Sequence, residues 1–179
     1  MEQESIALAW CDNGNVDGKF TQGICDVLLK SGIDFKTTIR SQGNQIARQR
    51  EKIIRYWYQN NTSDWLLWVD SDIVLTNDVL KKIWDAADKN TRPIVCGVYF
   101  ISKENEQSVM QPMPAVFNET GDDYKIAYVH PLPVDKVIQI DNAGLGLCLM
   151  HKSVVPKLRE MFPDQSMFAE QEGIGDKYV

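Results

Sequence analysis

The sequence predicts an α/β protein built on a mostly parallel sheet flanked by helices, and three observations support this prediction. Apolar runs typical of strands alternate with amphipathic segments typical of helices through the N-terminal half. The run Trp65 to Val69 is apolar at every position, which indicates a strand buried on both faces. Beyond about residue 102, prolines and turn residues replace this alternation and favour an antiparallel hairpin or edge in the C-terminal half.

The elements of the N-terminal half follow from their periodicity and their flanking residues. Strands are predicted at residues 5–10, 35–40, 65–69 and 93–101, and the second alternates apolar with polar residues as a half-exposed strand does. A first helix fits between the loop 11–18 and Gly32, a residue type that commonly follows a helix. A second fits from an N-cap at Asn44 to about residue 59, and a third begins at residues 76–78. The buried side of the second helix should carry Ile46, Ile53, Ile54 and Trp57.

The C-terminal half is predicted to be less regular. Residues 109–117 and 124–129 should pair as a hairpin around the turn 118–123. Residues 134–140 and 147–150 are further strand candidates. Ser153 should cap a short helix that tolerates Pro156 in its first turn.

Length and charge limit the classes of function. The chain has 179 residues and a formal net charge of −6, which suits one globular domain and argues against a nucleic-acid-binding protein, since phosphate backbones are bound mainly through Lys and Arg. The acidic start and the short apolar run after it predict neither a signal peptide nor a membrane span, so a cytoplasmic protein is expected. Four scattered cysteines in apolar segments are predicted to be buried, reduced thiols: Cys11, Cys25, Cys96 and Cys148.

Two carboxylates, Asp70 and Asp72, follow the buried strand directly. Because side chains alternate along a strand, both are expected on one face, with Ser71 directed the other way. Ligands of open α/β sheets bind beyond the carboxyl ends of the strands, where this pair falls. Adjacent carboxylates repel unless a cation lies between them, and oxygen ligands favour Mg²⁺ or Mn²⁺ over Zn²⁺. The pair therefore predicts a divalent metal site, although a short Asp-x-Asp also fits solvated turn residues.

Other polar residues are candidates for binding a phosphorylated ligand at the same edge. Arg48 lies one helical turn after Asn44, on the same face, and is suited to clamp a diphosphate near a helix N-terminus. The alternative is a solvated basic face made of Arg48, Arg50, Lys52 and Arg55. Asp12 and Asn13 follow the first strand and either contact a nucleoside or make a local turn. Gly144 either lets a substrate approach the backbone or marks a turn.

With the helix of Asn44 and Arg48, the apolar strand and Asp70-Ser71-Asp72, the chain resembles the nucleotide-sugar glycosyltransferases of the GT-A fold, in particular compact family-two-like enzymes of bacteria and viruses. The resemblance runs from about residue 6 to residue 158. It implies a Rossmann-like sheet, a nucleoside-diphosphate sugar donor, and Mn²⁺ or Mg²⁺ bound by Asp70 and Asp72. The donor site that it implies comprises Asp12, Asn13, Asn44, Arg48, Asp70, Ser71 and Gly144.

An inverting enzyme of this kind also needs a general base for the acceptor hydroxyl. Such enzymes commonly carry a Glu-Asp pair that this sequence lacks, and the remaining acidic candidates are Asp141, Glu170, Glu172 and Asp176. The sequence is therefore a fragment of a longer enzyme, an enzyme whose base lies elsewhere, or a module that binds the donor without turnover. A sugar-phosphate nucleotidyltransferase is a further alternative, although the glycine-rich, basic first loop expected for a triphosphate is missing.

This interpretation divides the single domain 1–179 into functional parts. Residues 1–101 would form the nucleotide-sugar-binding half, 102–163 the acceptor-side half, and 164–179 a mobile tail. The acceptor is expected to be a glycan, a lipid or a protein, and no nucleic-acid partner is expected. A homo-oligomer is compatible with the sequence.

Overall fold

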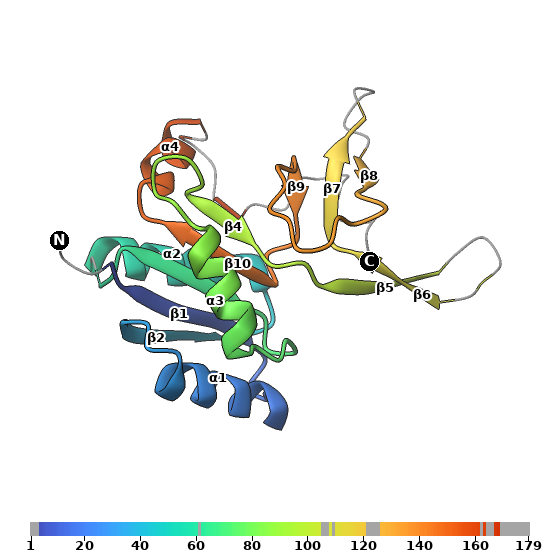
Figure 1. The fold of residues 1–179 in the computed structure, drawn as a ribbon. Helices are drawn as coiled ribbons and strands as arrows, with labels where there is room; N and C mark the ends of the chain where they lie inside the picture. Colours follow the sequence, from blue (N-terminus) through green and yellow to red (C-terminus); the bar gives the residue numbers. More distant parts are fainter. Residues whose placement is uncertain are drawn as a thin grey trace.

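The centre of the molecule is a five-stranded sheet with the order β2-β1-β3-β10-β4 (Figure 1). The computed structural model describes residues 4–60, 62–104, 108, 110–120, 126–161, 163 and 167–168. Strands β1 (Ile6–Asp12), β2 (Phe35–Gln42) and β3 (Trp65–Val69) are parallel. Strand β10 (Leu147–His151) is antiparallel to both β3 and β4 (Ile94–Cys96), so β4 runs in the same direction as β3. The predicted mostly parallel α/β fold is thus confirmed.

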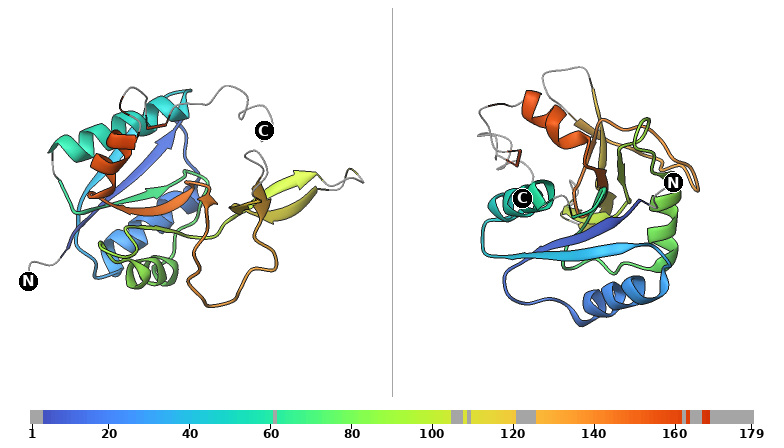
Figure 2. Two further views of the ribbon diagram at one scale, coloured as in Figure 1. Left: turned by 90° about the horizontal axis from the view of Figure 1, so that it is seen from above. Right: turned by 90° about the vertical axis from the view of Figure 1, so that its left-hand side faces the viewer.

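Helices cover both faces of this sheet, and each face has its own apolar core (Figure 2). Helices α1 (Gly18–Lys30) and α3 (Asn77–Ala86) pack on one face, while α2 (Ile46–Asn60) and α4 (Val154–Met161) pack on the other. The side chains of β3 alternate between the two cores, so all five of its residues are buried. This two-sided burial is why the strand is apolar at every position.

Local capping chemistry sets where the helices on the first face begin and end. Asp17 accepts a hydrogen bond from the Lys19 backbone at the start of α1, and Gly32 follows the end of that helix with φ +73°, as predicted. Thr76 caps α3 by accepting from the Val79 backbone. These caps orient both helices against the same apolar core.

Helix α2 begins one residue later than predicted. It starts at Ile46, and the Gln49 N–H donates to the carbonyl of Gln45, so Gln45 rather than Asn44 is the cap. Asn44 therefore lies outside the helix, and the predicted shared helical face of Asn44 and Arg48 is wrong. Ile46 is also 46% exposed, so the predicted buried stripe of α2 is confirmed for Ile53, Ile54 and Trp57 but not for Ile46.

The C-terminal half contains two small antiparallel sheets beyond the carboxyl end of β1 (Figure 1). One is the hairpin of β5 (Phe100–Glu104) and β6 (Met110–Pro114). The other has the order β8-β7-β9, formed by β7 (Val116–Glu119), β8 (Ile126–Tyr128) and β9 (Asn142–Ala143). The β7–β8 pairing confirms the predicted hairpin, whereas the expected strand 109–117 is divided between β6 and β7.

Two further strand predictions are wrong. The segment 93–101 divides into β4 and β5, and its bonding to β10 ends where the Gly97 N–H donates to the carbonyl of Leu147, the first residue of β10. Residues 134–140 form no strand, and Val134 and Val137 are 81% and 64% exposed. Their apolar alternation has no neighbouring strand in the described chain to bond with.

The cysteine prediction holds in part. Cys11 and Cys148 are buried, Cys96 is half-buried, and Cys25 is exposed on the outer side of α1, against the prediction. Burial raises the pKa of the Cys11 thiol to about 11.

The described helices include none that is both long and apolar enough to span a bilayer.

Candidate donor and metal site

Strand direction brings the predicted site residues to one edge of the central sheet. Asp12 ends β1 and Asp70 follows β3, and these two strands are parallel. Strand β10 is antiparallel to β3, so the segment before it, which contains Gly144, reaches the same edge. The carboxyl ends of parallel strands are where open α/β sheets bind ligands.

Asp70 sits in a turn that leaves the edge of the sheet. Its backbone N–H donates to the Gly146 carbonyl at 2.7 Å, and its own carbonyl accepts from the Ile73 N–H at 2.9 Å. The strand therefore ends at Val69, and the predicted alternation of side chains does not extend to Ser71 and Asp72. Backbone bonds on both sides hold the Asp70 carboxylate at a fixed place beside β10.

The carboxylates of Asp70 and Asp72 fit a hard divalent cation by their chemistry. Asp72 is exposed and the Asp70 side chain is 31% exposed. Both raise the pKa of the nearby Tyr99 hydroxyl, although burial is the largest cause of that rise. Within the described residues no cluster of three or more acidic, His or Cys side chains gathers around an ion position. A two-carboxylate site suits Mg²⁺ or Mn²⁺, which commonly complete their coordination with water and substrate phosphates.

Arg50 is a site residue that was not predicted. Its Nη2 donates to Asp70 Oδ1 at 3.0 Å, and its side chain is only 16% exposed. Arg48, the predicted diphosphate clamp, is exposed on the first turn of α2, and Asn44 is exposed ahead of that helix. The signal for Arg50 was its spacing, because it lies three and four residues before Ile53 and Ile54 on the buried stripe.

Tyr99 packs against the glycines before β10. The Gly146 N–H donates to the Tyr99 hydroxyl at 3.4 Å, and a Cβ added to Gly144 would lie 2.0 Å from that oxygen. Gly144 thus makes room for an aromatic ring, which is a third explanation beside the predicted alternatives of substrate approach and a turn. Because Gly146 also accepts from Asp70, the Tyr99 ring supports the turn that holds the carboxylate.

Asp12 forms a closed cluster at the end of β1. Its side chain is fully buried and accepts from Arg40 Nε at 2.6 Å and Nη2 at 2.8 Å. Trp10 Nε1 donates to it at 3.1 Å and the Gly14 N–H at 2.7 Å. These hydrogen bonds, the Arg40 pair first, hold the pKa of the Asp12 carboxyl below its ordinary value of 3.8. A carboxylate offers about four acceptor positions, and here four donors occupy them.

The other predicted residues lie at different places. Asn13 is exposed, and its side chain accepts from the Asn15 backbone in a local turn. Asp141 is exposed beside β7, where it accepts from the Glu119 N–H at 2.8 Å. Glu170, Glu172 and Asp176 fall outside the described residues, as does most of the tail 164–179.

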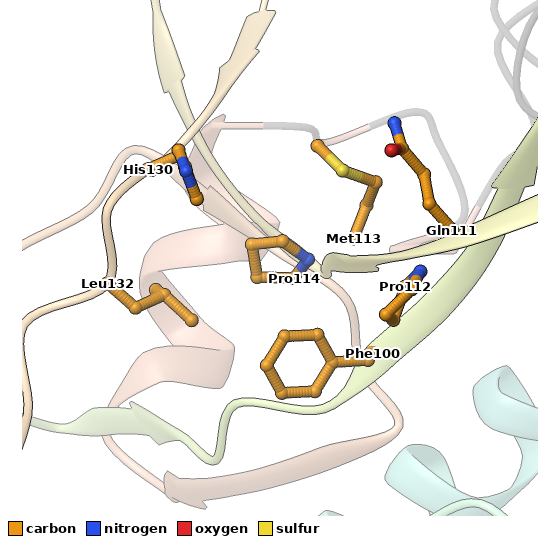
Figure 3. A pocket seen from close by; sticks show the side chains of 7 residues that line it. All are labelled: Phe100, Gln111, Pro112, Met113, Pro114, His130 and Leu132. Atoms are coloured by element: carbon orange, nitrogen blue, oxygen red, sulfur yellow. The ribbon is translucent and has the colours of Figure 1, made fainter. Parts of the chain in front are cut away.

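A groove of about 490 Å³ lies in the C-terminal half (Figure 3). It contains none of the predicted site residues. Its lining is mostly apolar and comprises Phe100, Gln111, Pro112, Met113, Pro114, His130 and Leu132.

Comparison with known families assigns this chain to a family. The profile described as glycosyl transferase family 2 matches residues 11–137, which include the Asp12 loop, Arg50, the Asp70 turn and Tyr99. The chain belongs to glycosyl transferase family 2. This glycosyltransferase has the GT-A fold predicted from its sequence, with β2-β1-β3 as the parallel part of its sheet. No curated protein matches the sequence.

Solved structures similar to this glycosyltransferase include two that match most of its length. A197 from STIV is 17% identical with a TM-score of 0.49, and the match covers 86% of this chain and 68% of A197. A glycosyltransferase involved in the glycosylation of the major capsid of PBCV-1 is 15% identical with a TM-score of 0.40, and the match covers 89% of this chain and 68% of that one.

Proposed function

We propose that this chain transfers a sugar from a nucleoside-diphosphate sugar to an acceptor hydroxyl, with Mn²⁺ or Mg²⁺ held by Asp70 and Asp72. The observation that carries the proposal is the contrast at the sheet edge between a saturated Asp12 and a partly exposed Asp70 fixed by backbone bonds. Asp70 has acceptor positions to offer, and the exposed Asp72 is two residues away. Membership of family 2 supports donor and acceptor chemistry of this kind.

The residues of the chain divide the task of binding the donor. Asp70 and Asp72 would hold a divalent ion through hard oxygen ligands, and the ion would supply positive charge to neutralise the diphosphate leaving group. Arg48 is exposed on the first turn of α2, where the positive end of the helix dipole adds to its own charge, and it would face the diphosphate. Asp12 shapes the β1–α1 loop, so that the exposed Asn13 would line the nucleoside pocket.

Acceptor activation is proposed for the half 102–163 together with the tail. The Asp141 carboxylate already accepts from the Glu119 backbone, so it acts as a brace between β7 and β9 and is the weaker candidate for the base. The remaining candidates are Glu170, Glu172 and Asp176. Gly144 would border the sugar through the Tyr99 ring that covers it.

Calorimetric titration with ADP, CDP, GDP, UDP and dTDP, with and without Mn²⁺, tests the proposal. We expect one nucleotide to bind much more tightly with Mn²⁺ than without it. In Asp72→Asn, Mn²⁺ should no longer raise the affinity for this nucleotide. Asp78→Asn is the matched control, because Asp78 is an exposed carboxylate in the first turn of α3. Metal-dependent binding that survives both Asp70→Asn and Asp72→Asn would remove the metal site from the proposal.

Hydrolysis of the matching nucleotide sugar then tests turnover. Release of free sugar by the wild type, and its loss in Asp72→Asn, would support a transferase. Binding without turnover in the full-length natural protein would favour a module that holds the donor only.

A further inference from the structure

We propose that Arg50 couples metal binding to diphosphate binding: it pairs with Asp70 while the site is empty and transfers its hydrogen bonds to the donor diphosphate when the metal takes the carboxylate. This inference rests on the proposed function and extends it to a residue outside the predicted donor set. It explains why an arginine lies on the buried stripe of α2.

The position of Arg50 supports a role at the centre of the site. Its guanidinium donates to Asp70 Oδ1 at 3.0 Å. Asp70 in turn bonds through its backbone N–H to the Gly146 carbonyl, so the guanidinium lies close to the end of β3 and to the segment before β10. Arg50 thus lies over the edge where the ligand is expected, on the inner side of α2.

Burial makes the partner of Arg50 important. A guanidinium that is 16% exposed is poorly hydrated, and a buried charge that loses its partner is strongly destabilising. A metal ion that draws the Asp70 carboxylate away would leave the Arg50 charge poorly hydrated and without its partner. Binding of the metal alone is therefore opposed by the existing ion pair.

A diphosphate removes this opposition. Arginine presents five N–H donors in a planar fork that matches phosphate oxygens, and one of these donors accounts for the recorded bond to Asp70. When a diphosphate arrives with the metal, Arg50 exchanges one anionic partner for another. The metal and the diphosphate should then favour each other's binding by the same factor, as linkage requires.

The test compares four proteins, the wild type and three variants, by two binding measurements. Affinity for Mn²⁺ alone is followed by the electron paramagnetic resonance of the free ion, and affinity for the nucleoside diphosphate that the wild type binds best is followed with and without Mn²⁺. The variants are Arg50→Gln, which removes the charge, and Arg50→Lys, which keeps the charge without the fork. Lys52→Gln is the control, because it removes an exposed positive charge from the same helix.

In the wild type, we expect Mn²⁺ to raise nucleotide affinity about tenfold or more, within the usual range of coupling between sites. In Arg50→Gln, Mn²⁺ alone should bind several-fold more tightly while its effect on nucleotide affinity falls to about twofold. Arg50→Lys should lie between these values, and Lys52→Gln should match the wild type. Because Arg50→Lys keeps a cation beside Asp70, it still tests the role of the guanidinium fork if Arg50→Gln folds poorly.

Two results would overturn the coupling role. Unchanged or weaker binding of Mn²⁺ alone in Arg50→Gln would mean that Arg50 does not compete for Asp70. Equal coupling in the wild type and Arg50→Lys would mean that the fork plays no part. A wild type that binds neither Mn²⁺ nor any of the nucleotides would instead refute the proposed function itself.

Discussion

Two aspartates at the ends of neighbouring parallel strands have opposite surroundings. Asp12, at the end of β1, is fully buried and accepts hydrogen bonds from Arg40, Trp10 and the Gly14 backbone. Asp70, after β3, is 31% exposed, and among the described residues its side chain has one partner, Arg50. The same residue type at the same edge is thus a structural anchor in one strand and an available ligand in the next.

The difference arises from what lies beside each carboxylate. Arg40 is the direct neighbour of Trp10 in the β1–β2 ladder, so a half-exposed arginine from the adjacent strand closes over Asp12. Beside Asp70 the neighbouring strand is β10, whose preceding glycines supply backbone carbonyl and N–H groups but no side chain. A site is open where the neighbouring strand contributes backbone only.

The largest expected effect is on Mn²⁺ affinity, which should fall much further when Asp70 is replaced than when Asp12 is replaced. Asp70→Asn should weaken Mn²⁺ binding in the presence of the nucleotide by at least about 100-fold. Replacing a residue that only supports a metal ligand already lowers metal affinity by about 10–100-fold. Asp12→Asn should weaken it only about two- to threefold, since its oxygens are already occupied and act through the loop. Titration of both variants with Mn²⁺ at saturating nucleotide measures this. Equal losses in the two variants would mean that the contrast has no functional meaning.

A second prediction reverses the order of the two variants. Asp12→Asn should lower the free energy of unfolding by about 2 kcal/mol, because each Asp12 oxygen accepts from two donors and the amide replaces one of these oxygens with an NH2 group, which leaves buried donors unpaired. Asp70→Asn should cost less, about 1 kcal/mol, because Arg50 loses the negative charge beside it but keeps a hydrogen bond to the Asn oxygen, and the Asp70 side chain is partly exposed. Urea unfolding at neutral pH gives both values. A larger loss for Asp70→Asn would identify Asp70 as the structural residue.

The open aspartate was predictable from sequence, and the closed one was not. A uniformly apolar strand followed by two carboxylates places Asp70 at the edge of a sheet whatever the rest of the fold. The closure of Asp12 depends on Arg40, which is 28 residues away and reaches it only through strand pairing. Long-range pairing of this kind leaves no local pattern, so Asp12 was expected to be a turn residue or a nucleoside contact.

The remaining errors have similar causes. Arg50 was grouped with the exposed basic residues of its helix by residue type, although its spacing to Ile54 and Trp57 assigns it to the buried stripe. The strand predicted at 134–140 had the right alternation but no partner strand in the described chain, and alternation alone does not make a sheet. Patterns within one segment therefore predicted the elements well, and contacts between segments decided the site.

The smallest expected effect concerns acid unfolding and the closed aspartate. The pKa of Asp12 is lowered in the folded state, chiefly by Arg40, so its ionised form stabilises the fold fully above the ordinary value of 3.8 and less as the pH falls through the folded-state pKa. The difference in unfolding free energy between the wild type and Asp12→Asn should thus be constant from about pH 7 to 5 and shrink below pH 3.8. Urea midpoints of both proteins across this range measure it, since the other carboxyls titrate equally in both. A difference that stays constant in acid would show that the packing of Asp12, rather than its charge, holds the end of β1.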